Sequence, residues 1–200
     1  MPHSDVPSPS HPAAGTLPQA LAQGLSIRPS VAGDAAALAA IYGWHVLNGT
    51  GTFELDPPDA SDMLRRRDDV LTDGWPWLVA ERAGALVGFA YASPFRDRPA
   101  YRHCLEDSIY LHPDVQHQGI GRLLLAELIA RCQALGARQM LAVIGDSANA
   151  GSIGLHRALG FVPVGLLVSV GRKFDHWLDV VLMQRALGAG DASGPEGAAP

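Results

Sequence analysis

The sequence predicts an α/β (α+β) fold in which helices flank one mixed, mostly antiparallel sheet. Strand-like and helix-like hydrophobic patterns alternate along residues 25–187. The pair Ala83-Gly84 between two apolar runs indicates a hairpin, and the last two predicted strands follow each other with no helix between them. Strands joined by such short connections pair in antiparallel fashion. A wholly parallel sheet is therefore excluded.

The N-terminal half of the predicted domain holds two helices and up to four strands. The predicted strands cover residues 25–29, 52–55, 77–81 and 86–92. The predicted helices run from Asp34 to about Asn48, and from Asp59 or Ser61 to about Gly74. An aspartate or serine at these starts can accept a hydrogen bond from the free N–H groups of a first helical turn. The Pro57-Pro58 pair ends the strand before the second helix.

The C-terminal half alternates strand and helix more regularly. Its predicted strands cover residues 107–112, 140–144, 162–168 and 178–183, and its predicted helices cover 119–135 and 149–159. One stripe of the longer helix carries Leu124, Leu128, Cys132 and Leu135, so this stripe is expected to face the core. Glycines at 136 and 160 follow the two helices, where a residue with positive φ is common.

The composition favours one globular domain and excludes several classes of protein. Hydrophobic residues make up 48% of the 200 residues, enough to form a core without disulfides or a structural metal. A net charge of −5 argues against a nucleic-acid binder. Cys104 and Cys132 form no metal-spaced or redox pair. Neither a signal peptide nor a membrane-spanning apolar run is visible, so we expect a cytoplasmic protein.

The two ends differ in composition from the domain between them. Residues 1–24 are rich in Pro and Ser, and residues 188–200 are rich in Gly, Ala and Pro. Such segments bury too little apolar surface to offset the entropy of ordering. We therefore expect a disordered leader over 1–24, a folded domain over 25–187 and a disordered tail over 188–200.

A glycine-containing turn precedes the longest predicted helix. It reads Gln116-His117-Gln118-Gly119-Ile120-Gly121-Arg122. The first N–H groups of a helix have no partner inside it and carry the positive end of its dipole, so they can bind a pyrophosphate. Glycines allow phosphate oxygens to approach the backbone, and Arg122 adds a positive charge. The Rossmann and Walker patterns are both absent, and a tight strand-to-helix turn without a ligand is the alternative interpretation.

Gln116-x-x-Gly119-x-Gly121 resembles the signature of the GNAT superfamily of acetyltransferases. Further strings, in the same order, are similar to the phosphinothricin N-acetyltransferase family within it. These strings are Pro94-Phe95-Arg96, Glu106-Asp107-Ser108-Ile109-Tyr110, Val143-Ile144-Gly145-Asp146-Ser147, Leu155-His156-x-x-Leu159-Gly160-Phe161, Lys173-Phe174 and Trp177-Leu178-Asp179-Val180. The resemblance covers about residues 26–186 and implies the GNAT acyl-CoA N-acyltransferase fold. Arg172 and Asp175 depart from the family pattern and leave the specificity for the acceptor open.

The resemblance implies acetyl-CoA as co-substrate and no metal. The residues that match coenzyme-binding positions of the family are Ile109, Tyr110, Leu111, Gln116, His117, Gln118, Gly119, Ile120, Gly121, Arg122, Asn149 and Ser152. The backbone around Ile109 and Leu111 would bond the pantetheine arm as an added strand does. Taken alone, these two are ordinary core strand residues, and Asn149 is an ordinary helix N-cap.

Acetyl transfer to an amine requires a group that removes a proton from the amine and a proton for the leaving thiolate. Glu106 matches the proposed catalytic base of the family, although alone it would be an exposed acid at a strand start. His156 stands where many GNAT enzymes have a Tyr that is thought to protonate the thiolate. A lone histidine on a helix is otherwise more often structural. The resemblance therefore implies Glu106 and His156 as catalytic residues.

The acceptor site is expected near Arg96, Asp97 and Arg98, with Lys173 as a further candidate. Guanidinium groups suit a carboxylate or phosphinate, and exposed surface arginines are the alternative. The sequence thus predicts a homodimeric N-acetyltransferase for a small amino acid-like amine of the phosphinothricin or methionine sulfoximine type. It predicts no nucleic-acid or membrane partner. An acetyltransferase for protein or peptide amines, or a non-catalytic acetyl-CoA-binding regulatory module, are the alternatives.

Overall fold

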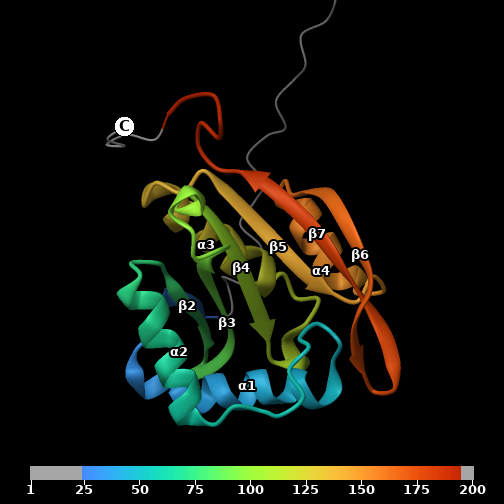
Figure 1. Cartoon of the computed structure of the whole chain (residues 1–200). Coiled ribbons are helices and arrows are strands. Elements are labelled where there is room, and N and C mark those ends of the chain that lie inside the picture. Colours follow the sequence, from blue (N-terminus) through green and yellow to red (C-terminus); the bar gives the residue numbers. More distant parts are fainter. Residues whose placement is uncertain (1–23, 195–200) are drawn as a thin grey trace, which may run out of the picture.

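One seven-stranded sheet crosses the molecule and has helices on both faces (Figure 1). The structure is a computed structural model that describes residues 24–194. In sheet order the strands are β1 (Leu25–Pro29), β2 (Trp77–Arg82), β3 (Ala85–Pro94), β4 (Cys104–Leu111), β5 (Gln139–Gly145), β7 (His176–Ala186) and β6 (Val162–Lys173). The α-helices are α1 (Ala35–Asn48), α2 (Ala60–Thr72), α3 (Ile120–Ala134) and α4 (Ala150–Ala158).

The pairing confirms a mixed, mostly antiparallel sheet. Every neighbouring pair of strands is antiparallel except β4 and β5, which are parallel. The β2–β3 hairpin turns at Ala83 and Gly84, whose φ angles are 51° and 79°. Both angles are positive, as a tight two-residue hairpin turn of this kind requires. The Ala83-Gly84 signal therefore predicts the correct turn.

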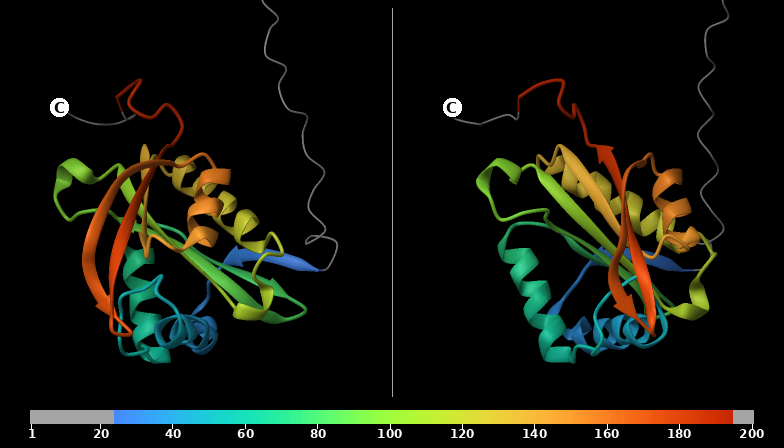
Figure 2. Two further views of the ribbon diagram at one scale, coloured as in Figure 1. Left: turned by 90° about the vertical axis from the view of Figure 1, so that its right-hand side faces the viewer. Right: turned by 45° about the vertical axis from the view of Figure 1, so that its right-hand side comes forward.

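Two hydrophobic clusters fix the helices to opposite faces of the sheet (Figure 2). On one face, Leu124 and Leu128 of α3 pack in the same cluster as Leu105 of β4. On the other face, Leu38 of α1 and Met63 of α2 share a cluster with strand residues that include Trp77 and Phe89. Along β4 the side chains alternate between the faces, because successive residues of a strand point to opposite sides. Leu105 accordingly belongs to the α3 side, and Tyr110 lies against the α1–α2 side.

The predicted strand over 52–55 is wrong, because residues 49–59 form an irregular connection between α1 and α2. Its polar groups bond to side chains instead of to a neighbouring strand. Thr52 Oγ1 lies 2.8 Å from the Tyr42 hydroxyl, and the Thr52 carbonyl accepts a hydrogen bond from Lys173. Phe53 fits against Gly171, where an added Cβ would lie 2.1 Å from the ring. This segment, residues 49–54, thus bridges α1 to the β6–β7 hairpin.

Two of the three predicted aspartate or asparagine caps form as expected. Asp59 accepts from the Asp62 N–H at 2.8 Å at the start of α2, and Asn149 accepts from the Ser152 N–H at 3.1 Å at the start of α4. Asp34 does not cap α1. Its carboxylate instead accepts from the Val31 N–H at 2.8 Å and pairs with Arg28, which closes the short 3-10 turn before α1.

The stripe predicted for the longest helix also needs one correction. Leu124, Leu128 and Cys132 are fully buried, but Leu135 is 56% exposed. Leu135 follows the last residue of α3, where the chain leaves the helix, so it no longer continues the buried face.

The last two strands are longer than predicted, since β6 continues to Lys173 and β7 begins at His176. Phe174 and Asp175 form the turn between them, with φ angles of 48° and 61°.

After β7, residues 188–194 form turns, and the Arg138 guanidinium donates to the Gly194 carbonyl at 2.8 Å. Residues 1–23 and 195–200, in which most of the predicted leader and the end of the tail fall, lie outside the described residues. None of the helices within 24–194 is long and apolar enough to span a membrane.

Candidate active site

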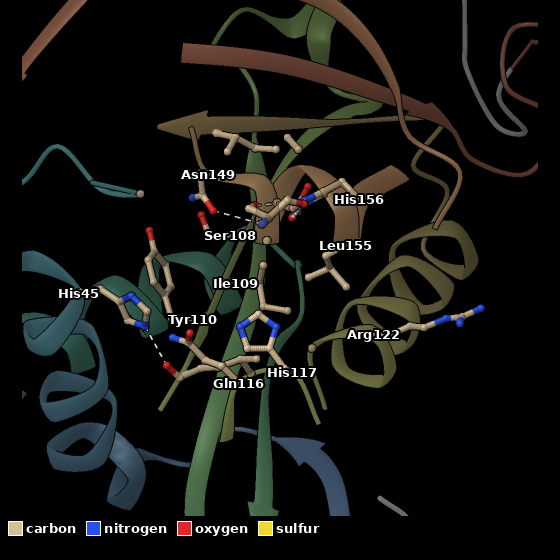
Figure 3. Close-up of a pocket in the computed structure, with 18 of the residues that line it drawn as sticks. His45, Ser108, Ile109, Tyr110, Gln116, His117, Arg122, Asn149, Leu155 and His156 are labelled. Carbon is tan, nitrogen blue, oxygen red and sulfur yellow. Dashed lines mark hydrogen bonds and ion pairs between the residues drawn. The ribbon is translucent and has the colours of Figure 1, made fainter. Parts of the chain in front are cut away.

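A cleft opens inside the sheet because β4 and β5 pair over only four residues each. Cys104–Asp107 lie opposite Gln139–Ala142, and beyond this point the two strands diverge (Figure 1). Both strands keep their other partners, since β4 stays paired with β3 to its end and β5 with β7 to its end. The space between them is a cleft of about 400 Å³ (Figure 3). Residues from β4, β5, the start of α3 and α4 line it.

The β4 wall of this cleft presents backbone groups that no β5 residue covers. Ser108, Ile109, Tyr110 and Leu111 all line the cleft. His45 of α1 contacts one of these groups, with its Nε2 2.8 Å from the Leu111 carbonyl oxygen. Burial lowers the pKa of His45, so its imidazole is neutral and donates this hydrogen bond. An extended ligand with amide groups can pair with the remaining edge as an added strand would.

The predicted phosphate-binding turn forms the end of the cleft at the start of α3. Gln116, His117, Gly119, Gly121 and Arg122 line the cleft. Helix α3 begins after Gly119, whose φ is 81°, and no side chain caps it. The first N–H groups of α3 therefore have no capping acceptor, whereas α2 and α4 begin with a capping side chain. The exposed Arg122 extends from this first turn (Figure 3).

Two residues of the predicted turn lie elsewhere. The Gln118 side chain accepts from Arg82 at 2.7 Å and donates to the Asp114 carbonyl, and it is not part of the cleft wall. Ile120 is 1% exposed and packs in the core.

The two glycines of the turn serve different purposes. Gly119 supplies a positive φ, and a Cβ built on it would meet no atom within 4 Å. A Cβ on Gly121 would lie 3.2 Å from Leu111 Cδ1 and 3.4 Å from Leu155 Cδ2. Both leucines line the cleft. Gly121 therefore preserves the width of the cleft, a role that the glycine pattern alone does not indicate.

Asn149, the residue that caps α4, and Ser152 and His156 of α4 also line the cleft. Figure 3 shows Asn149 and His156 near Ser108 of β4. His156 is 2% exposed, and its Nε2 lies 2.9 Å from Asp107 Oδ2. Its Nδ1 lies 2.8 Å from the Ser152 carbonyl oxygen. Burial lowers the pKa of His156, but the hydrogen bond and charge of Asp107 outweigh burial and raise it overall. No motif or spacing in the sequence indicates that Asp107 is the partner of His156.

Glu106 is half-buried on the other face of β4, the side of α1 and α2. It precedes Asp107, the last β4 residue that pairs with β5, and lies opposite Leu141 of β5. Burial raises the pKa of its carboxyl group, the charge of Asp107 adds to this, and Arg96 opposes it. A carboxyl group with a raised pKa is suited to accept a proton. Glu106 itself is not one of the residues that line the cleft.

Residues 38–161 match the Acetyltransferase (GNAT) family. The chain belongs to the GNAT family of acetyltransferases. It is 50% identical over 194 residues to the phosphinothricin N-acetyltransferase of Alcaligenes faecalis, covering 94% of this chain and 98% of that one. It is 39% identical over 160 residues to the L-methionine sulfoximine/L-methionine sulfone acetyltransferase of Pseudomonas aeruginosa, covering 80% and 92%.

A solved relative shows the same fold. The crystal structure of a GNAT superfamily phosphinothricin acetyltransferase from Sinorhizobium meliloti in complex with AcCoA superimposes with a TM-score of 0.84. The two chains are 48% identical, and the match covers 88% of this chain and 96% of that one. The GNAT fold implied by the sequence strings is therefore confirmed.

The candidate acceptor-binding residues of this GNAT chain do not gather at one point. Arg96, Asp97 and Arg98 are exposed in the loop after β3, and none of them lines the cleft. Arg96 lies 4.6 Å above the Phe95 ring and is close enough to Glu106 to lower the pKa of that carboxyl group. Lys173 is only 4% exposed.

The Lys173 ammonium donates to the carbonyl oxygens of Gly49 and Thr52, each at 2.9 Å. It thereby anchors segment 49–54 to the β6–β7 hairpin.

Several cleft residues are not singled out by the sequence analysis, among them His45, Gly51, Ser108 and Asp107. Alternation along β4 is the signal that could identify Asp107, since it shares a face with Leu105. His45 and Gly51 come from the α1–α2 region and carry no such signal. The described residues contain no group of three or more His, Cys, Asp or Glu side chains arranged to hold a metal.

Proposed function

We propose that this GNAT chain transfers the acetyl group of acetyl-CoA to the amine of a small amino acid-like substrate. The observation that carries the proposal is the separation of β4 and β5 between an uncapped helix start and a half-buried glutamate. This arrangement offers an anion site and an unpaired strand edge along one cleft, and a base on the other face of the strand that lines it. The names of two relatives, phosphinothricin N-acetyltransferase and L-methionine sulfoximine/L-methionine sulfone acetyltransferase, support an amino acid-like acceptor.

The residues of the cleft fit acetyl-CoA. The N–H groups at the start of α3 lack a capping side chain and suit its pyrophosphate, with Arg122 adjacent. The open edge of Ser108–Leu111 suits the amides of a pantetheine arm. When bound, acetyl-CoA supplies an acetyl group activated as a thioester. Asn149 and Ser152 line the same cleft from the start of α4.

Glu106 is the group that we assign as general base. A free amine is mostly protonated near neutral pH, so a proton must leave it before or during attack. Burial and Asp107 raise the pKa of Glu106 toward working pH, which makes its carboxylate a better proton acceptor than an exposed one. Neither cysteine is suited to act as a nucleophile, because burial raises the pKa of both thiols.

Arg96 is the group that we assign to the acidic end of the acceptor. Its charge lowers the pKa of the Glu106 carboxyl group, so we place the acidic end of the acceptor on the same side as the proposed base. A guanidinium group binds a carboxylate or phosphinate through two parallel hydrogen bonds. Asp97 and Arg98 frame the same loop. Lys173 contributes indirectly, because it holds segment 49–54 in place.

The β6–β7 hairpin supports assembly as a homodimer. Along β6 and the following turn, seven apolar residues are between 46% and 67% exposed: Val162, Val164, Leu166, Leu167, Val168, Val170 and Phe174. An apolar surface of this extent on an edge strand is uncommon in a monomer and suits a second copy of the chain. Light scattering should give twice the mass of the chain, and a monomer at micromolar concentration would contradict the dimer.

A cytoplasmic location is part of the proposal. Free thiols at Cys104 and Cys132 are consistent with a reducing cytoplasm.

An amine panel tests the proposed function. The full-length protein is incubated with acetyl-CoA and with phosphinothricin, methionine sulfoximine, methionine sulfone, free amino acids or a short peptide, and released CoA thiol is measured. Turnover of amino acid-like amines with little turnover of the peptide is the expected result. Preference for the peptide would instead favour a protein acetyltransferase. Binding of acetyl-CoA without thiol release from any amine would favour a regulatory module.

A further inference from the structure

The end of β4 directs the peptide groups of two residues toward the cleft. Peptide groups of successive strand residues point alternately to the two sides of the strand. The His112 N–H donates to the Val87 carbonyl of β3 at 2.9 Å. Leu111, one residue earlier, and Ile109, three residues earlier, therefore point their peptide groups to the other side, where β5 has separated from β4. Both residues line the cleft.

His45 of α1 already occupies one of these peptide groups (Figure 3). It lines the cleft, and its Nε2 lies 2.8 Å from the carbonyl oxygen of Leu111, the last residue of β4. A carbonyl oxygen can only accept a hydrogen bond, so Nε2 carries a proton. The last acceptor of the open β4 edge is thus taken by a side chain of the protein itself.

The second ring nitrogen of His45, Nδ1, is left as an acceptor. Burial lowers the pKa of His45; the hydrogen bond to Leu111 opposes this shift, and the charge of Lys173 adds to it. The pKa is lowered overall, so the imidazole is neutral at neutral pH and has only one N–H. Because that proton is on Nε2, Nδ1 carries a lone pair.

Nothing in the described part of the chain occupies this lone pair. Within residues 24–194 the only hydrogen bond of the His45 ring is the one from Nε2. The Lys173 ammonium donates to carbonyl groups of segment 49–54 instead. In the same range, buried side-chain nitrogens and oxygens without a partner are found in Trp77, His103 and Asp107. His45 Nδ1 is therefore not sealed in the interior, and a ligand in the cleft that His45 lines can reach it.

We propose that His45 binds the pantetheine arm of acetyl-CoA through Nδ1, which accepts a hydrogen bond from an N–H or O–H group of the arm. This inference rests on the proposed function, because it places the arm along the open edge of β4. The arm carries amide N–H groups and a hydroxyl, all of which need acceptors in the cleft. His45 removes the Leu111 carbonyl as an acceptor and offers Nδ1 at the same end of the edge. One nitrogen thus fixes the end of β4, and the other contacts the coenzyme.

Two ligands that differ by the arm test this contact in binding calorimetry. Adenosine 3′,5′-bisphosphate resembles the nucleotide end of the coenzyme and has no pantetheine arm. His45→Phe keeps a ring without nitrogen, so the Kd of acetyl-CoA should rise about 3–10-fold, as for a lost neutral hydrogen bond, and that of the bisphosphate should not change. Arg122→Gln, at the start of α3, is the matched control and should weaken both ligands. An unchanged acetyl-CoA Kd in a folded His45→Phe protein, or equal weakening of both ligands, overturns the proposal.

Nitrogen NMR of the wild type separates a contact with the coenzyme from support of β4, since loss of the Leu111 bond could also weaken binding. Without ligand, Nε2 of His45 should give the signal of a protonated nitrogen and Nδ1 that of an unprotonated one. Acetyl-CoA should move the Nδ1 signal toward that of a hydrogen-bonded nitrogen, and the bisphosphate should not. A protonated Nδ1, or an Nδ1 signal that saturating acetyl-CoA does not move, overturns the proposal even if His45→Phe fails to fold.

The amine panel keeps the two proposals apart. If acetyl-CoA moves the Nδ1 signal of His45 but no amine releases CoA thiol, the proposed function fails and the His45 contact stands. If amino acid-like amines are acetylated but acetyl-CoA leaves the Nδ1 signal unmoved, the proposed function stands and the contact fails.

Discussion

The two edges of β5 differ in how far they are paired. On one edge β5 pairs with β7 along all its residues, from Gln139 to Gly145. On the other edge it pairs with β4 only from Gln139 to Ala142 and then separates. We call these the closed seam and the open seam. A cleft can therefore form within a sheet when each of the two separating strands stays paired with its neighbour on the other side.

The open seam exposes peptide groups of β4 without loss of the fold, because β3 and β7 still hold the two strands. The residues of this edge, Ser108–Leu111, are half-buried and line the cleft, so an extended ligand with amide groups can pair with them. The closed seam has no such groups to satisfy. The predictions below contrast changes at the open seam with matched changes elsewhere.

The largest effect is expected from Glu106, at the end of the paired part of the open seam. Glu106→Gln keeps the shape of the side chain and removes its basicity. The turnover number should fall by about 10²–10⁴-fold, the usual contribution of general base catalysis. Acetyl-CoA affinity should change only a few-fold. Retention of more than about a tenth of wild-type turnover across pH would mean that Glu106 is not the base and that the enzyme works mainly by positioning.

Filling the open seam should remove coenzyme binding. In Gly121→Val the added side chain presses on Leu111 and Leu155 of the cleft wall. Acetyl-CoA at about 100 times its Kd stabilises a protein by about 2.7 kcal/mol, and this stabilisation should disappear in the variant. Gly165→Ala in β6, where a Cβ meets only ordinary contacts with Leu182, is the control that keeps it. Thermal unfolding measures both; equal stabilisation of the two variants would place the coenzyme elsewhere.

A smaller effect is expected from the loop beside the open seam. Arg96→Ala should raise the KM of the acceptor about 10–150-fold, which corresponds to one lost hydrogen bond with a charged group, and leave that of acetyl-CoA nearly unchanged. Arg102→Ala, in the same loop and also exposed, is the matched control. If both variants behave alike in steady-state kinetics, the acidic group of the acceptor is bound elsewhere.

The smallest effect concerns stability. The pKa of Glu106 is raised in the folded protein, so the folded state binds this proton more tightly than the unfolded state. Ionisation of the carboxyl group therefore lowers the free energy of unfolding as pH rises through the pKa of the folded state. Below the pKa of the unfolded state the group is protonated in both states, so this loss is absent. Denaturant unfolding should find Glu106→Gln slightly more stable than wild type at pH 7 and equal to it at pH 4. Equal stability at both values would show that the carboxylate is well solvated.

The sequence predicts the turn at one end of the cleft better than it predicts the other surroundings of the cleft. The turn at 116–122 and Asn149 depend on local spacing and capping, and the structure places most of them on the cleft. Segment 49–54 could not be predicted, since its conformation depends on Lys173 and Gly171, more than 100 residues later in the chain. The Asp107–His156 pair likewise joins residues 49 positions apart, and only the sheet order brings them together.

Hydrogen exchange with and without acetyl-CoA tests the central claim most directly, because it measures the two seams in one sample. Acetyl-CoA should newly protect amides in residues 108–111 of β4 and at the start of α3, with little change where β7 pairs with β5. Protection confined to β6 and β7, or none at 108–111 under saturating acetyl-CoA, would contradict the assignment of the open seam as the coenzyme site.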